Sequence, residues 1–295
     1  MRQIMVSGVL ETETRLHIGS GRDAIGFEET DSSVIKVNID GLEQAYIPGS
    51  SIKGIFRSCV ENILTRLGIK VCEPYPNDKD YLCKDISREI SELSRDFDIS
   101  GLMDAINRLC LSCKIFGTTN YSSHVNFIDC IPLENIKIST GVAPGIAINR
   151  RDGTTIPGGL FNYEYIEPGS RFLFQMQVFN LPNYLIGLLF NVIELINKGL
   201  VLIGGKKRAG LGFCKIWINK IEYRTIDTTK VIDFNRIDLM GDRFKIEALK
   251  DLKEEDYDYE VLSSEVKGKS LEEFSDLLIK RYVEVWVKHV RSGKG

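Results

Sequence analysis

The sequence predicts an α+β sandwich of the ferredoxin type. Two observations lead to this class. Segments with the period-two alternation of strands and segments with the apolar spacing of helices follow one another in the order strand, helix, strands, strand, helix and strand. A glycine-rich loop at 204–212 separates the second helix from the last strand. The chain has 295 residues, of which 43% are hydrophobic, so it is long enough for a large core and has an ordinary globular composition.

Three strand-like segments lead into the first predicted helix. They cover residues 3–18, 34–37 and 45–47. The Pro-Gly-Ser sequence at 48–50 ends the last of these strands and predicts a helix N-cap. Apolar residues with helical spacing continue to Leu67, and Gly68 follows as a C-cap, so a helix is expected over 51–67.

The second half of this order lies after residue 117. Strands are expected at 125–131, 145–149, 171–178 and 213–223. Asp-Gly at 152–153 and Pro-Gly-Gly at 157–159 are turn signals, and they predict a hairpin over 150–161. Residues 183–198 have a helical pattern that is apolar on most sides, so this helix is expected to be buried.

Residues 69–116 are polar and interrupt the order, with helix-like stretches at 85–97 and 102–111, so they are interpreted as an insertion. The insertion holds four of the seven cysteines: Cys72, Cys83, Cys110 and Cys113. Four soft ligands in a segment without a strong apolar core favour a structural Zn²⁺ site, because the metal supplies folding energy that burial does not. The spacing between Cys72 and Cys83 is not that of a standard zinc knuckle, so His124 is an alternative ligand. Reduced core thiols are the alternative to a metal site.

The remaining cysteines, Cys59, Cys130 and Cys214, have apolar neighbours and are expected in the core. The N-terminus lacks the pattern of a signal peptide, and the longest apolar run, 184–196, is too short to span a bilayer. The sequence therefore predicts a soluble, cytoplasmic protein without a membrane partner. Beyond about residue 226 the chain is acidic and polar, and this C-terminal extension of 226–295 ends in an amphipathic helix expected at 271–290.

Two cationic segments are candidate phosphate-binding sites. The glycine-rich loop carries three consecutive cations: Lys206, Lys207 and Arg208. At the start of the first helix, Ser51 supplies a hydroxyl, and Lys53 and Arg57 lie four residues apart on one face. The alternatives are a surface turn with solvated charges and a well-capped helix with an exposed basic stripe. Because the formal net charge is -3, we expect phosphate binding only if these cations gather in one groove.

These segments resemble the RAMP superfamily of CRISPR-associated proteins. Within it, the chain is most similar to the backbone subunits of type III (Csm/Cmr-type) effector complexes, which line up along a guide RNA. The resemblance covers residues 15–215, and the glycine-rich loop is part of it. The other stretches that carry it are Leu-His-Ile-Gly at 16–19, Asp-Ser-Ser-Val-Ile at 31–35, Pro-Gly-Ser-Ser-Ile-Lys-Gly at 48–54 with Arg57, Cys-Leu-Ser-Cys-Lys-Ile-Phe-Gly at 110–117, and the glycine-bearing stretch 148–164.

The resemblance implies an RRM-like palm formed by residues 1–68 and 117–225, with a projecting thumb hairpin at about 145–165. It implies binding of CRISPR guide RNA and assembly with other RAMP subunits. By matching positions, the RNA contacts are Ser51, Lys53, Arg57, Arg150, Arg151, Lys206, Lys207 and Arg208. Arg150 and Arg151 are expected at the base of the thumb. Asn149 departs from the family pattern, because many relatives have an acidic residue at this position.

Asp31 is the candidate catalytic residue. The resemblance implies that the matching aspartate is required for cutting of target RNA with Mg²⁺ or Mn²⁺. The chemistry agrees, because cutting inside an A-form helix needs a splayed nucleotide and a group that binds metal or takes a proton. Two alternatives remain: a non-catalytic capping subunit in which Asp31 caps a turn, and a guide-processing endoribonuclease with His17 as general base.

Overall fold

The computed structural model describes residues 2–19, 32–72, 83–133, 137–224, 229–235, 243–246, 259–262 and 267–293. Its main sheet has five strands in the order β4-β7-β1-β8-β9, and all neighbouring strands are antiparallel. These strands are β1 (Gln3–Thr12), β4 (Val125–Phe127), β7 (Arg171–Phe179), β8 (Cys214–Arg224) and β9 (Thr229–Asp233). The α+β class that the sequence predicts is confirmed.

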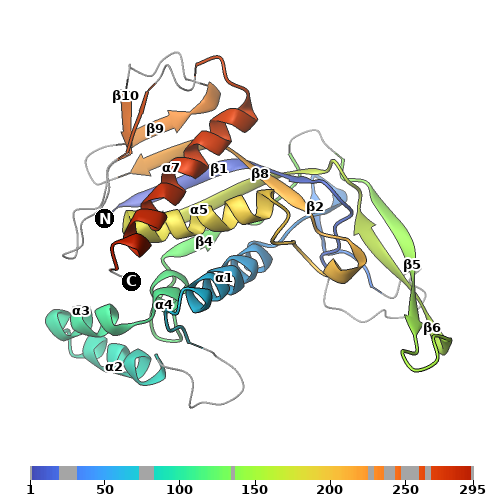
Figure 1. Ribbon diagram of the computed structural model, residues 1–295, viewed down its shortest axis with the longest axis horizontal. Coiled ribbons are helices and arrows are strands. Elements are labelled where there is room, and N and C mark those ends of the chain that lie inside the picture. The colour runs from blue at the N-terminus through green and yellow to red at the C-terminus, as the bar shows by residue number, and fades with distance from the viewer. Residues whose placement is uncertain are drawn as a thin grey trace.

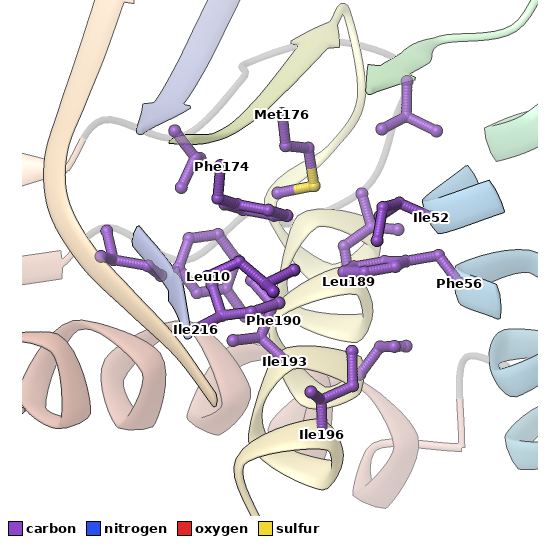
Figure 2. Close-up of a cluster of buried hydrophobic side chains, with 14 of the residues drawn as sticks. Leu10, Ile52, Phe56, Phe174, Met176, Leu189, Phe190, Ile193, Ile196 and Ile216 are labelled. Atoms are coloured by element: carbon purple, nitrogen blue, oxygen red, sulfur yellow. The ribbon is translucent and has the colours of Figure 1, made fainter. Parts of the chain in front are cut away.

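Three helices pack on one face of this sheet: α1 (Gly49–Arg66), α5 (Asn183–Asn197) and α7 (Leu271–Arg291) (Figure 1). Every second residue of β1 is buried against them, as the alternation of side chains along a strand requires. Figure 2 shows the centre of the core, where Leu10, Phe174 and Ile216 from the sheet meet the helices. The helical side chains there are Ile52, Phe56, Leu189, Phe190, Ile193 and Ile196. None of the helices in the described part of the chain combines the length and apolarity needed to cross a membrane.

Up to Arg224 the main-sheet strands and the helices on them occur in the order β1-α1-β4-β7-α5-β8, which is the order that the sequence predicts, and β9 and α7 follow. The C-terminal segment adds to this unit. A capping box between Ser270 and Glu273 starts α7, and the helix buries Phe274, Leu278 and Tyr282 in the main core. The predicted helix at 271–290 is therefore confirmed, and this helix is part of the principal hydrophobic core.

A two-stranded hairpin, β5 (Thr140–Ile148) and β6 (Thr155–Ile166), extends from the sheet at one end of the molecule (Figure 1). One side of it is buried at the base, where Tyr163 and Tyr165 pack with Leu211. Several apolar side chains of the hairpin stay exposed: Val142, Ile146, Ile148, Ile156 and Leu160. The hairpin is longer than the sequence predicts, because the pairing already begins at Thr140.

The insertion forms three helices, α2 (Lys84–Arg95), α3 (Ile99–Arg108) and α4 (Leu111–Phe116), and α2 and α3 lie at the opposite end of the molecule from the hairpin (Figure 1). Both predicted helices are present, but the boundaries of α2 differ from the prediction by one and two residues and those of α3 by three. Phe97 has a φ of 55°, so α2 ends before it. Asp98 caps α3 by accepting a hydrogen bond from the Gly101 N–H, so this helix begins earlier than predicted.

The N-cap of α1 is Pro48, within the predicted segment 48–50, but no side chain of this tripeptide caps the helix, which begins at Gly49. Gly49 packs so closely on β4 that a Cβ would lie 2.1 Å from the Phe127 carbonyl oxygen. This approach brings the Gly49 N–H to the Asp129 carboxylate, at 2.8 Å. A carboxylate from another segment therefore takes the place of the hydroxyl cap.

The remaining strands form two small hairpins. Strands β2 (Lys36–Ile39) and β3 (Leu42–Ala45) pair with each other, and so do β10 (Arg243–Ile246) and β11 (Tyr259–Leu262). The strand predicted over 3–18 stops at Thr12, although Leu16 still makes an isolated bridge to Ile166.

Candidate functional site

A cleft of about 1050 Å³ lies between α1 and the segment that joins α5 to β8. On the helix side, its polar wall is made by residues that share one face of α1: Ser51, Ser58, Asn62 and Arg66. On the other side, Gly204, Gly205 and Lys207 of the glycine-rich loop line it, next to the apolar residues Leu200 and Val201. Two segments that the sequence predicts to bind phosphate, at Ser51 and Lys207, therefore border the same cleft.

The glycine-rich loop is wound tightly against the segment around His17. Gly204 has a φ of 78°, and a Cβ there would lie 2.4 Å from the His17 carbonyl oxygen. The Gly205 N–H donates a hydrogen bond to the same oxygen, at 2.8 Å. This packing leaves Lys207 and Arg208 exposed in a short 3-10 turn, and neither forms an ion pair with a residue of the described chain. Both cations can therefore accept an anionic ligand.

Lys53 and Arg57, the two α1 cations that the sequence predicts to contact RNA, do not line the cleft, whereas a third cation of this helix, Arg66, does. Arg57 forms an ion pair with Glu61, with Nε and Oε1 3.0 Å apart. The same Glu61 oxygen accepts a hydrogen bond from the Ser112 hydroxyl of α4, at 2.8 Å. Burial, with a smaller contribution from the Arg57 charge, lowers the pKa of Lys53. The structure thus places Ser51 at the cleft and Arg57 beside the insertion.

Arg150 and Arg151 lie at the tip of the hairpin, in the exposed turn between β5 and β6. The expectation that they lie at its base is wrong, because β5 begins at Thr140, before the predicted thumb start at about 145, and the turn that holds both arginines joins Ile148 to Thr155. Asn149 organises this turn. Its side chain accepts a hydrogen bond from the Arg151 N–H at 2.9 Å and donates one to Asp152 at 3.3 Å. An amide serves this double role, which an acidic residue at the position would not.

Asp31, the predicted catalytic residue, lies outside the described residues, which resume at Ser32. His17, the alternative catalytic group, is only 5% exposed. Its Nδ1 lies 2.6 Å from the Glu164 carbonyl oxygen, and its Nε2 lies 3.1 Å from the Ser32 hydroxyl. Because a carbonyl oxygen only accepts, Nδ1 carries a proton and donates to the Glu164 carbonyl, and Nε2 shares a hydrogen bond with the Ser32 hydroxyl. His17 thus joins the residue after Asp31 to strand β6.

Glu164 is a buried acid on β6, next to the contacts of His17. The sequence patterns include it only as the last residue of the stretch 148–164. Its carboxylate pairs with the Lys36 ammonium at 2.8 Å and accepts from the Val34 N–H at 3.1 Å. Burial works against the charge, but the hydrogen bonds from Lys36 and the Thr140 hydroxyl outweigh it and hold the pKa of Glu164 below its usual value. An acidic residue within an otherwise aromatic strand was the signal available in the sequence.

The substitution Glu164→Gln is expected to lower the free energy of unfolding by about 1 kcal/mol at pH 6, because it removes the charged partner of Lys36. The folded-state pKa of Glu164 lies below the unfolded value, so its stabilisation is complete above about pH 4.5 and is lost as the pH falls through the folded-state pKa. Urea unfolding should therefore show the two proteins converging as the pH falls toward 3. Glu43→Gln, at an exposed position of β3, is the control. If the difference in unfolding free energy between Glu164→Gln and the unaltered chain stayed constant with pH, the stabilising role of the Glu164 charge would be contradicted.

The four cysteines of the insertion meet at one point, and their sulfur atoms all lie within 4.8 Å of one another. The Cys72 sulfur is 3.6 Å from that of Cys110 and 3.7 Å from that of Cys113. A tetrahedral site with Zn–S bonds of about 2.3 Å requires sulfurs about 3.8 Å apart. Backbone N–H groups also point at the cluster, as in the 3.2 Å contact from Cys110 to the Cys83 sulfur. The cluster therefore has the dimensions and ligand type of a structural metal site.

His124 is not part of this cluster. Its Nδ1 contacts the Phe179 carbonyl at 2.8 Å, and its Nε2 contacts the Tyr121 hydroxyl at 2.6 Å, so both nitrogens are engaged. The pKa values of the thiols depend on their surroundings, and within the cluster those of Cys72 and Cys113 are raised whereas those of Cys83 and Cys110 are lowered. Burial raises the pKa of Cys130 and of Cys214 to about 12, which keeps them protonated, as core thiols are expected to be. Neighbouring thiols, first that of Cys113, lower the pKa of Cys110 and favour a thiolate there.

The chain belongs to a known class of protein, because the family model of the RAMP superfamily matches residues 9–215. The chain therefore belongs to the RAMP superfamily. Among curated proteins, it is similar to the CRISPR system Cms endoribonuclease Csm3 of Methanocaldococcus jannaschii, with 28% identity over 182 residues. This match covers 61% of the present chain and 63% of the relative, so the chain spans less than two thirds of the length of the curated relative that it matches.

Proposed function

We propose that this chain is a guide-RNA-binding backbone subunit of a type III CRISPR ribonucleoprotein, and that it cuts target RNA through a metal-assisted aspartate, Asp31. The observation that carries the proposal is the cleft shared by Ser51 and Lys207, within the region that matches the RAMP superfamily. In this proposal the five-stranded sheet with its helices is the RRM-like palm, and the β5–β6 hairpin is the thumb. The partners are the guide RNA, the target RNA and other RAMP subunits of a cytoplasmic complex.

The cleft suits a sugar-phosphate chain of any sequence. Lys207 and Arg208 are exposed cations without partners among the described residues, and the adjacent glycines let the backbone approach a phosphate. Contacts of this kind carry no sequence information, which a subunit that holds arbitrary guides requires. Base pairing between guide and target would then supply the specificity.

The cutting step needs a nucleotide that leaves the helical stack, because the 2′-oxygen must lie in line with the phosphorus before the 5′-oxygen can leave. The hairpin offers an apolar wedge for this purpose. Ile146 and Leu160 face each other across its strands and are 56% and 65% exposed. Mg²⁺ or Mn²⁺, when bound, would stabilise the charge that develops on the phosphate. Asp31 would hold the ion, and His17 with Ser32 would anchor the chain directly after it.

The geometry disfavours guide processing with His17 as general base. The ring is buried, and both of its nitrogens are hydrogen-bonded within the protein. A general base must reach the proton that it removes, directly or through one water molecule. We therefore keep His17 in a positioning role within the proposal.

We further propose that the cysteine cluster binds Zn²⁺ and stabilises the insertion. Cys72, Cys83, Cys110 and Cys113 would be the four ligands and would leave no open position for a substrate. The chemistry that the metal supplies is structural, because it crosslinks α4 to the segments that flank 73–82.

Removal of either exposed cation of the glycine-rich loop should weaken RNA binding in a salt-dependent way. Lys207→Ala and Arg208→Ala are each expected to reduce the slope of log affinity against log salt by about 0.7, the value for one phosphate contact on a single strand. Fluorescence anisotropy with two single-stranded RNAs of unrelated sequence measures this slope, and both RNAs should give the same result.

Arg171→Ala is the matched control, because Arg171 is 54% exposed but already pairs with Glu11. It should leave the slope unchanged. An equal effect of all three substitutions would show that the binding reflects net charge alone. No binding of either RNA by the unaltered chain would overturn the proposed function.

A further inference from the structure

The three consecutive cations of the glycine-rich loop have different surroundings. Lys207 and Arg208 are exposed, and Lys207 lines the cleft. Lys206 is half-buried and is not among the residues that line the cleft. Its backbone also differs, because Lys206 has a φ of 53° in the left-handed region, which is uncommon for a residue with a side chain. This conformation turns the Lys206 side chain to a different partner.

That partner is the base of the β5–β6 hairpin. The Lys206 ammonium lies 4.6 Å from the centre of the Phe161 ring and 4.6 Å from the centre of the Tyr163 ring. Both distances are within the range of a cation–π interaction, and a cation shared by two rings gains from each of them. Phe161 and Tyr163 are themselves neighbours, with ring centres 6.3 Å apart.

The aromatic row continues and is held by a second cation. Tyr165 follows Tyr163 along β6, and the Arg15 guanidinium lies 4.6 Å from the centre of its ring. Leu211, which comes shortly after Lys206 in the chain, is buried in the same cluster. The hairpin base is therefore fixed by a small separate cluster, to which the glycine-rich loop contributes one cation and one apolar side chain.

We propose that Lys206 is a positioning residue that clamps the hairpin to the glycine-rich loop through Phe161 and Tyr163, and that it is not a phosphate ligand. In this role Lys206 sets the angle between the hairpin and the glycine-rich loop, and the three cations of the loop have different functions. Lys207 and Arg208 meet the RNA, while Lys206 holds the hairpin. The second part of this statement rests on the proposed function, whereas the clamp itself does not.

Hydrogen exchange of the full chain without RNA tests the clamp. Lys206→Met keeps the length of the side chain and removes its charge. It should speed exchange of the β5–β6 amides roughly two- to tenfold, the range expected for loss of a cation–π contact. Lys206→Arg keeps a cation over the rings and should restore protection. Phe161→Leu should reproduce the effect, and the double variant should add little to either single change. Unchanged exchange in Lys206→Met would overturn the clamp.

RNA binding tests the division of roles. Lys206→Met should keep the salt slope of the unaltered chain, whereas Lys207→Met should reduce it by about 0.7. Lys207→Met should in turn leave hairpin exchange unchanged. An equal loss of slope in both variants would overturn the assignment, whatever the exchange shows. If the unaltered chain bound no RNA, the proposed function would fail, and the exchange measurement would still decide the clamp.

Discussion

In an assembled complex, Asp31→Ala is expected to lower the rate of target RNA cutting at least about 100-fold and to leave guide RNA bound. The physical reason is that a carboxylate placed to hold a divalent ion acts on the charge of the transition state, whereas in the proposed function phosphate contacts elsewhere would hold the guide. Asp31→Asn keeps the size of the side chain and removes the charge, so it should be almost as slow. Cutting rates at each position of a labelled target, with guide content measured in parallel, give the result.

Two neighbouring acids provide the matched control. Glu28→Gln and Glu29→Gln each remove one charge from the same short segment as Asp31. If charge near the cut site were all that mattered, these variants would lose as much activity as Asp31→Ala. If Asp31→Ala still cut the target at every position, Asp31 would not be the catalytic residue, and the alternative of a non-catalytic capping subunit would be favoured.

If the cysteine cluster binds Zn²⁺ as proposed, Cys113→Ser should release the metal from the insertion and unfold α2 and α3 locally. Loss of one of four thiolates should cost more zinc affinity than the roughly 10–100-fold that an outer-shell partner costs. The cluster also supplies much of the local core, because Cys72, Cys83 and Cys113 pack with Ile90 and Leu109. Metal content of the purified chain and hydrogen exchange of α2 and α3 measure the two effects.

Cys59→Ser is the matched control, since Cys59 is 8% exposed but lies in the main core, away from the cluster. It should retain zinc and the protection of α2 and α3. A chelator added to the unaltered chain should reproduce the effect of Cys113→Ser. A Cys113→Ser variant with the same zinc content as the unaltered chain, or an unaltered chain that takes up no zinc, would contradict the metal site.

Much of the fold follows from patterns within single segments. The helices at 183–198 and 271–290 are predicted nearly to the residue, because their apolar spacing is long and uninterrupted. Cys130 and Cys214 are also correctly predicted to lie in the core, because their neighbours in the sequence are apolar. The boundaries of α2 and α3 are missed, because a single left-handed residue, Phe97, ends one helix without a glycine to signal it.

The candidate site, like the fold, is predicted only in part by the sequence. The glycines and cations of the loop at 204–212 predict a phosphate-binding segment from composition alone, and the structure places Gly204, Gly205 and Lys207 of this loop at the cleft. The sequence does not show that Lys206 has different surroundings from Lys207 and Arg208, because the partners of Lys206 lie on β6, more than forty positions earlier. Spacing likewise left the fourth ligand open between a cysteine and His124, and the structure engages both His124 nitrogens elsewhere.

The sequence by itself determined the order of strands and helices, the family and the residue types able to bind phosphate or zinc, because periodicity and short motifs are local properties. Only the tertiary structure decided which of these residues meet. In the structure, Ser51 and Lys207 line the same cleft, and the Lys206 ammonium lies over an aromatic ring of the hairpin. Arg150 and Arg151 lie at the tip of that hairpin. At the start of α1 the Asp129 carboxylate accepts the hydrogen bond from the Gly49 N–H, in place of the expected hydroxyl cap. Such contacts join segments far apart along the chain, and the packing of the whole core sets them.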